Sequence, residues 1–253
     1  MSSAKATMAE EVRLQKLLAT SGIASRRKCE ELMLAGLVEV DGEIVTRLGT
    51  KVDPSRSVIR VDGKRLPPVS DSVYLVLNKP RGVVSAMSDP HSKRTLSDFV
   101  NDRPERLFHV GRLDTDTEGL IILTNDGEFA HRLAHPSYEV DKTYVAEVEG
   151  LAGKPLLAAL GHTVQLEDGP VDVSQARVLS RHGSKSIVEL TIHEGRNRIV
   201  RRLLAHLGHP VLQLTRTRIG PIKLGTLRSG QLRTLTASNS ATCSTLLPFE
   251  PAA

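Results

Sequence analysis

Hydrophobic residues near the start of the chain recur at helical spacing. Leu14, Leu17 and Leu18 lie three and four residues apart, which predicts a short helix that ends at Gly22. Ser25 then stands in the N-cap position of a second predicted helix, "RRKCEELMLAG". The chain therefore begins with a predicted pair of short helices.

The pattern then changes from helical spacing to alternation. The segments "LVEVDGEIV" and "SVIRVDGKRL" each alternate around an Asp-Gly pair, at 41–42 and 62–63, and this is the signature of a tight hairpin. The Pro- and Ser-rich stretch "PPVSDS" at 67–72 follows as a candidate linker. We therefore predict a small α+β domain over residues 12–70.

Longer hydrophobic segments dominate the rest of the chain. Strands are predicted in "VYLVLNKPRG" and at 120–124, 142–150, 173–180 and 186–195, the last two joined as a hairpin through "RHGSK". Helices are predicted at 128–135, capped by Asp126, and at 197–209, each stopped by a proline or glycine. Because strands outnumber helices and few βαβ repeats occur, the fold class is α+β. We predict a second domain over residues 73–245, with a mixed, largely antiparallel sheet flanked by helices.

Composition narrows the class of protein. The chain has 253 residues, a net charge of +5 and a sequence pI near 9.4, which favours a polyanionic partner. Residues 12–70 hold 11 Lys+Arg against 7 Asp+Glu, so much of the excess charge lies in the first domain. No apolar run is long enough for a membrane span, and the start lacks the apolar core of a signal peptide. With Cys29 and Cys243 as the only cysteines, we expect no disulfide framework and a cytoplasmic location.

Three acids lie close together before the apolar run "LIIL". Asp114, Asp116 and Glu118 could bind a metal ion, act as a glycosidase pair, or form a polar turn. No calcium-loop pattern accompanies them. His131 and His135 have metal-ligand spacing but no evident third ligand, so we expect no metal.

Two other segments make a simple surface turn a poor explanation. Alternation in "KTYVAEV" places Tyr144 on the same strand face as Ala146 and Val148, which predicts that it points inward, as a core or a functional tyrosine. Arg198, Arg201 and Arg202 lie along one flank of the helix predicted at 197–209, beside its apolar face. An arginine at that edge needs a carboxylate partner to be partly buried.

The first turn of the second helix is unusually basic. Arg26, Arg27 and Lys28 lie where the helix dipole disfavours cations, at a cost of roughly 0.3–1 kcal/mol each. A bound phosphate would offset that cost, and a solvated basic face is the alternative. The segment "RLQKLLATSGIASRRKCEELMLAGLVEVDGEIV" resembles the S4 RNA-binding domain over about residues 12–60. The resemblance implies binding to structured RNA through the helix pair.

The second domain resembles the pseudouridine synthases, specifically the bacterial branch with an N-terminal S4 domain that acts on ribosomal RNA. The matching segments are "LNKPRGVVSAMSD", "LFHVGRLDTDTEGLIILTNDGEFAHRLAHP", "KTYVAEVEG" and "HEGRNRIVRRLLAHLGHPVLQLTRTRIGPIKLG". Ile199 departs from the family pattern, where many relatives have glutamine. The resemblance implies isomerisation of uridine to pseudouridine without cofactor or metal.

The resemblance also assigns roles. It implies that Asp114 is the catalytic aspartate, that Tyr144 packs against the target base, and that Arg201 pairs with the aspartate, with Arg198 as the residue most easily confused with it. Asp116 and Glu118 match no catalytic position. Arg112 is a candidate for the flipped base or the RNA backbone, or for a structural ion pair. The full set of expected RNA-binding residues is Arg13, Lys16, Arg26, Arg27, Lys28, Lys79, Arg112, Arg196, Asn197 and Arg198.

The expected partner is ribosomal RNA or a ribosomal assembly intermediate, bound by a monomer. The spacing of "EGRNRIVRRLL" looks most like the enzyme of the large ribosomal subunit. The same reaction on the small-subunit RNA, a non-catalytic assembly factor and a glycoside hydrolase are the alternatives. The glycoside hydrolase predicts a neutral or acidic, aromatic-rich groove, which the basic charge and the lack of Trp oppose.

Overall fold

The structure, a computed structural model, describes residues 11–235. The chain forms two compact units. One contains the residues up to Ser72 together with Pro104–Arg106, and the other contains Val73–Arg103 and the residues from Leu107 onward. The predicted end of the second domain at 245, Cys243 and the C-terminal tail lie outside the described residues, as does most of the N-terminal tail. Within residues 11–235, no helix has the length and apolar character to cross a membrane.

The first unit contains the predicted helix pair and both predicted hairpins, together with a pair of short strands, at 12–13 and 51–52, that was not predicted. Helices α1 (Leu14–Thr20) and α2 (Arg26–Leu34) pack over a small core, and the Ser25 hydroxyl caps α2 by accepting a hydrogen bond from the Lys28 amide. The strands are β1 (Val12–Arg13), β2 (Val38–Val40), β3 (Glu43–Ile44), β4 (Lys51–Val52), β5 (Ile59–Val61) and β6 (Lys64–Arg65). Both Asp-Gly pairs turn a hairpin with positive φ at each residue, which confirms the predicted turns.

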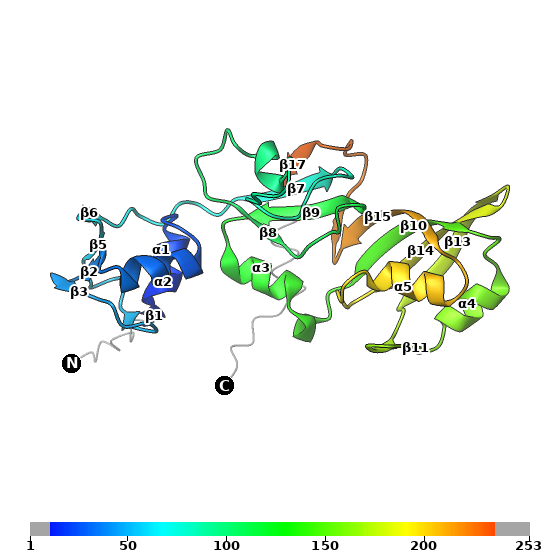
Figure 1. Cartoon of the computed structure of the whole chain (residues 1–253), viewed down its shortest axis with the longest axis horizontal. Helices are drawn as coiled ribbons and strands as arrows, with labels where there is room; N and C mark the ends of the chain where they lie inside the picture. The colour runs from blue at the N-terminus through cyan, green and yellow to red at the C-terminus, as the bar shows by residue number, and fades with distance from the viewer. Residues whose placement is uncertain (1–10, 236–253) are drawn as a thin grey trace, which may run out of the picture. The chain divides into compact units, whose positions relative to one another are not determined.

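The second unit centres on a nine-stranded sheet in the order β13-β14-β10-β15-β9-β7-β17, with β16 beside β15 and β8 beside β9 (Figure 1). Only β9 and β15 pair in parallel among the described strands, so the prediction of a mixed, largely antiparallel sheet is confirmed. The strands are β7 (Tyr74–Lys79), β8 (Phe108–Val110), β9 (Glu118–Thr124), β10 (Lys142–Glu149), β13 (Gln175–His182), β14 (Lys185–Ile192), β15 (Val211–Ile219), β16 (Ile222–Lys223) and β17 (Leu232–Thr234). A separate hairpin joins β11 (Val164–Leu166) and β12 (Gly169–Val171).

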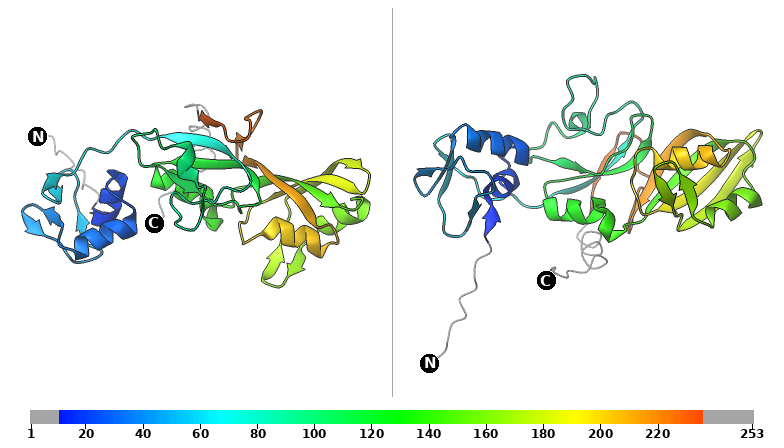
Figure 2. Two further views of the ribbon diagram at one scale, coloured as in Figure 1. Left: turned by 45° about the horizontal axis from the view of Figure 1, so that its top comes forward. Right: turned by 60° about the horizontal axis from the view of Figure 1, so that its bottom comes forward.

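The sheet is buried on both faces near its middle. Leu75 and Leu77 of β7 join one core cluster and Val76 joins the other, and β9 divides its residues in the same way. Helices α4 (Lys154–Leu160) and α5 (Ile199–His206) pack on the first face, and α3 (Gly127–Ala134) packs on the second. Figure 2 shows these helices from two further directions. Burial on both faces explains the unbroken apolar run "LIIL".

Some elements differ from the sequence-based expectation. Strand β15 was not predicted, although it lies in the middle of the sheet, and neither were α4, β11 and β12. The helix predicted at 197–209 begins only at Ile199, because Arg198 has a left-handed backbone with φ 50°. That conformation cannot belong to a helix, and it places Arg198 in the loop before α5.

Candidate active site

The loop between β8 and β9 carries Asp114 and is fixed by hydrogen bonds. The Ser85 hydroxyl accepts from the Leu113 amide at 3.0 Å and donates to the Leu113 carbonyl at 2.7 Å. The Gly82 amide donates to the Thr115 carbonyl at 2.7 Å, and the Thr117 amide donates to the Asp114 carbonyl at 3.0 Å. Asp114 is thus held on an ordered turn, with 32% of its side chain exposed to solvent.

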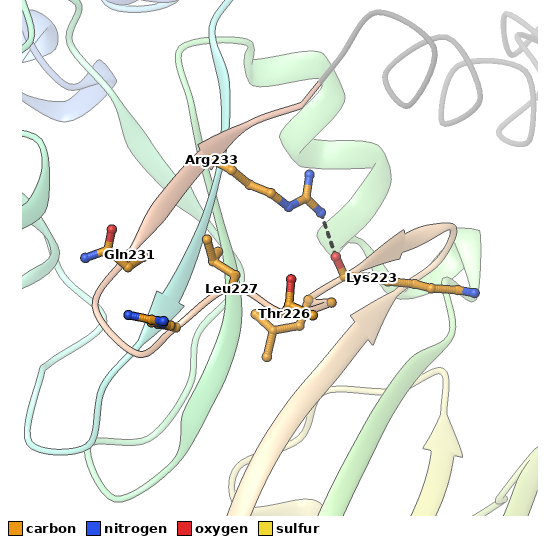
Figure 3. Close-up of a pocket in the computed structure, with 8 residues that line it drawn as sticks. Lys223, Thr226, Leu227, Gln231 and Arg233 are labelled. Atoms are coloured by element: carbon orange, nitrogen blue, oxygen red, sulfur yellow. Dashed lines mark hydrogen bonds between the residues drawn. The ribbon is translucent and has the colours of Figure 1, made fainter.

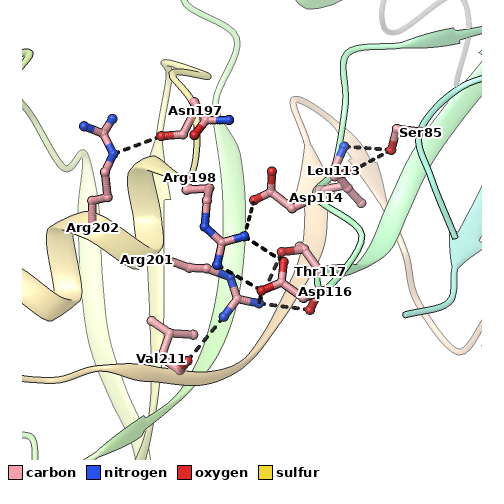
Figure 4. Close-up of polar contacts among 10 residues, drawn as sticks. All are labelled: Ser85, Leu113, Asp114, Asp116, Thr117, Asn197, Arg198, Arg201, Arg202 and Val211. Carbon is pink, nitrogen blue, oxygen red and sulfur yellow. Dashed lines mark hydrogen bonds and ion pairs between the residues drawn. The ribbon is translucent and has the colours of Figure 1, made fainter. Parts of the chain in front are cut away.

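Arg198, in the loop before α5, and Arg201, in the first turn of α5, meet this turn (Figure 4). Arg198 donates both guanidinium arms to Asp116, with 3.0 Å to each carboxylate oxygen, and its Nη1 lies 3.8 Å from Oδ2 of Asp114. Arg201 donates to the Asp116 carbonyl at 2.9 Å and to the Val211 carbonyl at 3.2 Å, and its Nη2 lies 3.4 Å from the Asp116 carboxylate. Bidentate contacts of this kind fix direction as well as charge.

This arrangement changes two sequence-based assignments. The cation nearest to Asp114 is Arg198, whereas Arg201 forms its ion pair with Asp116, so the expected Arg201–Asp114 pair is replaced by an Arg198–Asp114 pair. The physical reason is position, since Arg198 lies in the loop before α5 and Arg201 lies within the first turn of that helix. Asp116, which matched no catalytic position in the family resemblance, is the carboxylate that holds both arginines.

The charges around Asp116 keep it ionised. The hydrogen bonds from Arg198 hold the pKa of Asp116 below its usual range, helped by the positive charges of Arg201 and Arg198. Burial lowers the pKa of Arg201, whose side chain is only 11% exposed. The prediction that an arginine beside the apolar face of this helix needs a carboxylate partner is confirmed for Arg201.

Tyr144 points into the core, as its alternation pattern predicted. Its exposed fraction is 7%, and Ala146 and Val148 on the same face of β10 are fully buried. In the register of the sheet, Tyr144 lies opposite Leu190 of β14 on one side and Arg216 of β15 on the other. Cross-strand neighbours of this kind share a face of the sheet.

Lys79, expected to bind RNA, is fully buried and donates to the backbone carbonyls of Pro80 at 3.0 Å and Val83 at 2.9 Å. Burial lowers its pKa to about 8, and the nearby charges of Asp114, Asp116 and Glu118 oppose that shift. The structure leaves no part of the Lys79 side chain exposed for a contact with RNA, so that expectation gains no support from it. Lys79 organises the 80–83 turn instead.

The other expected RNA-binding residues fall into two groups. Most are solvent-exposed: Arg13, Lys16, Arg26, Arg27, Lys28, Arg112, Asn197 and Arg198. Arg112 has no ion pair with any residue between 11 and 235, so the structural alternative for it finds no support in the part of the chain described. Arg196 is engaged inside the protein, with hydrogen bonds to the Asp168 and Pro170 carbonyls and an ion pair to Asp168.

Sequence reasoning missed one buried cation beside these residues. Arg216 on β15 is 3% exposed and lies next to Tyr144 in the sheet. The segment "VLQLTRTRI" held a signal for it, because alternation along a strand would place Arg216 on the same buried face as Leu214. That signal could not be used, since the strand itself was not predicted.

A separate hollow of about 620 Å³ lies on the loops around β16 and β17 (Figure 3). Its charged lining residues are Lys223, Arg228 and Arg233, and Arg233 donates to the Lys223 carbonyl at 2.6 Å. None of its lining residues belongs to the Asp114 turn or to α5. Among residues 11–235, no three His, Cys, Asp or Glu side chains gather closely enough to hold a metal ion.

Known proteins share both units of this chain. The family model for RNA pseudouridylate synthase matches residues 73–206, and the S4 domain model matches residues 12–58. An uncharacterized RNA pseudouridine synthase of Mycobacterium leprae is 53% identical over 227 residues, covering 88% of this chain and 89% of that protein. Ribosomal large subunit pseudouridine synthase B of Bacillus subtilis is 48% identical over 226 residues, covering 88% of this chain and 92% of that protein.

A solved structure agrees with these sequence matches. A crystal structure of a pseudouridylate synthase superposes with a TM-score of 0.63 at 30% identity, covering 92% of this chain and 100% of that one. The resemblance drawn from the sequence is therefore confirmed, and so is the expectation of an enzyme. The chain belongs to the RNA pseudouridylate synthase family, with an S4 domain preceding the catalytic fold.

Proposed function

We propose that this enzyme isomerises one or more uridines to pseudouridine in ribosomal RNA, and that its substrate is the RNA of the large subunit. The choice of subunit is supported by the Bacillus subtilis relative, which is named for the large ribosomal subunit. The observation that carries the chemistry is the partly exposed carboxylate of Asp114 on an ordered turn, with Arg198 at 3.8 Å. We infer that the protein acts as a monomer in the cytoplasm.

In this proposal Asp114 is the catalytic residue. The reaction breaks the N1–C1′ bond of the target uridine, turns the uracil and bonds C5 to C1′. The C5 proton leaves at the end and N1 takes up a proton, so that the product is an isomer of the substrate. An ionised Asp114 serves as the group that starts glycosidic cleavage, by attack on the nucleotide or by removal of a ribose proton. Arg198, with Nη1 3.8 Å from Oδ2 of Asp114, orients that carboxylate.

Tyr144 and the arginines support that step. Tyr144 packs against the uracil and holds it while it turns, and the arginines of α5 stabilise negative charge near the turn. Arg201 acts on Asp114 indirectly, by holding Asp116 two residues along the same turn. The target base must leave its stack to reach Asp114, at a cost of a few kcal/mol.

The exposed cations of the S4 domain supply binding energy that offsets this cost. Arg13, Lys16, Arg26, Arg27 and Lys28 all have exposed side chains, as phosphate contacts require. Arg112 and Asn197 are the exposed candidates for RNA contacts beside Asp114. Arg196 acts through the loop before α5, since its hydrogen bonds tie that loop to the β11–β12 hairpin.

Pseudouridine mapping of both large ribosomal RNAs tests this proposal. Carbodiimide adducts and primer extension would be compared in cells with the gene, without it, and with Asp114→Asn. We expect one site in the large-subunit RNA to vanish in both the deletion and the mutant. A site lost from the small-subunit RNA would overturn the choice of subunit. A site that survives in the mutant would overturn the role of Asp114, and no change at all would favour a non-catalytic assembly factor.

A further inference from the structure

Arg216 occupies a special place in the sheet. Across four strands, Lys79 of β7 pairs with Gly119 of β9, Gly119 pairs with Arg216 of β15, and Arg216 pairs with Tyr144 of β10. Arg216 is therefore the direct cross-strand neighbour of Tyr144, the proposed base-binding tyrosine. Gly119 has φ 108°, and a Cβ added there would lie 2.3 Å from the Arg216 carbonyl oxygen, so only glycine lets β15 approach β9 this closely.

The pairing beside Arg216 is irregular. Thr143 lies opposite Arg218 but Tyr144 lies opposite Arg216, so Thr217 is an extra residue on β15 and the register shifts there. A bulge of this kind bends a strand and redirects its side chains, and bulges occur frequently next to active sites. The bulge at Thr217 directly follows Arg216 on β15.

The guanidinium of Arg216 bonds to backbone carbonyls and not to acids. Its Nε donates to the Leu120 carbonyl at 2.8 Å, and its Nη1 lies 3.5 Å from the Arg112 carbonyl. Within residues 11–235 no carboxylate forms an ion pair with it, and its buried Nη2 has no hydrogen-bond partner. An unsatisfied buried donor costs about 1–3 kcal/mol, and more for a charged group. Stability alone is therefore a poor reason for an arginine here.

The two carbonyls that Arg216 reaches lie at the two ends of the catalytic turn. Arg112 precedes Leu113 and Asp114, and Leu120 follows Glu118 and Gly119 at the start of β9. One planar guanidinium thus spans the segment that contains Asp114. A lysine carries the same charge but offers a single donor position, so it cannot bridge both ends in this way.

We propose that Arg216 is a positioning residue for the isomerisation. By bonding to the carbonyls at both ends of the Asp114 turn, it fixes the position of the catalytic carboxylate relative to Tyr144. It does not itself touch the reacting atoms. Loss of the bridge lets Asp114 shift without changing the surface that binds RNA, because Arg216 is buried. A displacement of about 1 Å at a reacting group can lower a rate by about 10²-fold.

The test compares Arg216→Lys and Arg216→Met in the full-length enzyme. The substrate is a transcript of the ribosomal RNA segment that the wild-type enzyme modifies, with tritium at C5 of uridine, and tritium release gives the single-turnover rate. Arg218→Lys and Arg218→Met are matched controls, since Arg218 is on the same strand but exposed. We expect Arg216→Lys to lower the rate by about 10²-fold, with RNA affinity changed less than twofold and a retained cooperative melt.

Each other outcome overturns the proposal. A wild-type rate in Arg216→Lys would show that the bridge is not needed, and equal losses of rate and RNA affinity would make Arg216 an RNA contact. If both Arg216 variants lose the cooperative melt, the residue is structural only. The inference rests on the proposed reaction but not on the choice of ribosomal subunit. A wild-type enzyme that releases no tritium from any ribosomal transcript would instead refute the proposed function.

Discussion

Two groups of cations, one in each unit, are held in opposite ways. In the S4 domain, Arg26 and Arg27 are exposed and have no ion pair among the described residues, and Lys28 pairs only with the exposed Glu31. In the catalytic unit, Arg198 and Arg201 are bound to Asp116 by several contacts. Free surface cations exchange counterions for phosphates, whereas bridged arginines hold geometry. The first group should set how tightly RNA binds, and the second should set how fast the reaction proceeds.

The largest effect should come from Asp114→Asn, which keeps the size of the side chain and removes its charge. We expect the single-turnover rate of tritium release to fall at least about 10³-fold, with RNA affinity changed less than twofold. Asp116→Asn is the matched control on the same turn, and its rate should fall much less. A rate for Asp114→Asn within tenfold of wild type would contradict the assignment.

Arg198→Met and Arg201→Met separate the roles of the two arginines that contact Asp116. Arg198 is the cation nearest to Asp114 and its side chain is 43% exposed, so its loss should lower the rate by about 10²-fold with little change in stability. Arg201 is 11% exposed. Its loss removes the donor to the Asp116 carbonyl and one of the two cations beside the Asp116 carboxylate. We expect Arg201→Met to lower the free energy of unfolding by about 1–3 kcal/mol, measured by urea denaturation.

The opposite ranking would also be informative. If Arg201→Met abolishes the reaction at unchanged stability while Arg198→Met is nearly active, then Arg201 acts on Asp114 directly during the reaction, as the family resemblance implied. The Arg198–Asp114 contact in this structure would then contribute little to the rate.

The sequence predicted the parts of this molecule that rest on local signals. Ser25 caps α2, Asp126 caps α3, and both Asp-Gly hairpins formed as expected. These features depend on a few adjacent residues whose backbone preferences are strong. The inward direction of Tyr144 followed from alternation alone.

The parts that the sequence did not predict depend on contacts between distant residues. Strand β15 has polar or charged residues at 213, 215, 216, 217 and 218, so nothing in its composition marks it as the middle of a sheet. Its place depends on pairing with β10 on one side and, on the other, on Gly119, which permits the close parallel pairing with β9. The choice between Arg198 and Arg201 as the partner of Asp114 likewise depended on the left-handed backbone at Arg198, which no local pattern signals.

A smaller effect is expected from the exposed cations of the S4 domain. The double substitution Arg26→Gln and Arg27→Gln removes two unpaired charges, so the slope of log affinity against log salt should decrease by roughly 1–2. RNA affinity should fall about tenfold at moderate salt, while the single-turnover rate at saturating enzyme stays the same. Filter binding at several salt concentrations measures the affinity and its salt slope, and tritium release at saturating enzyme measures the rate. A lowered saturated rate would show that the two groups of cations are not separable.

The last expected effect is on stability alone, and it is a pH dependence that arises from Lys79. Burial lowers its pKa in the folded protein to about 8, against 10.5 for an ordinary lysine. Between these values the unfolded chain binds more protons than the folded one, so the free energy of unfolding must rise with pH across that window. Below pH 8 the protonated, buried amine costs up to about 3 kcal/mol. Lys79→Met should therefore flatten the rise in stability between pH 8 and 10.

Lys142 gives the matched comparison, because burial lowers its pKa to about 8 as well. Lys142→Met should remove a separate part of the same rise, while Lys64→Met, at an exposed site, should leave the curve unchanged. Urea denaturation at pH 7.5, 8.5 and 9.5 provides the measurement. The comparison uses the slope of the free energy of unfolding against pH and not its absolute value, because Lys79→Met also leaves the Pro80 and Val83 carbonyls without their donor at every pH. If stability depends on pH in the same way for wild type and Lys79→Met, the buried Lys79 amine stays in one protonation state between pH 7.5 and 9.5, which contradicts the prediction.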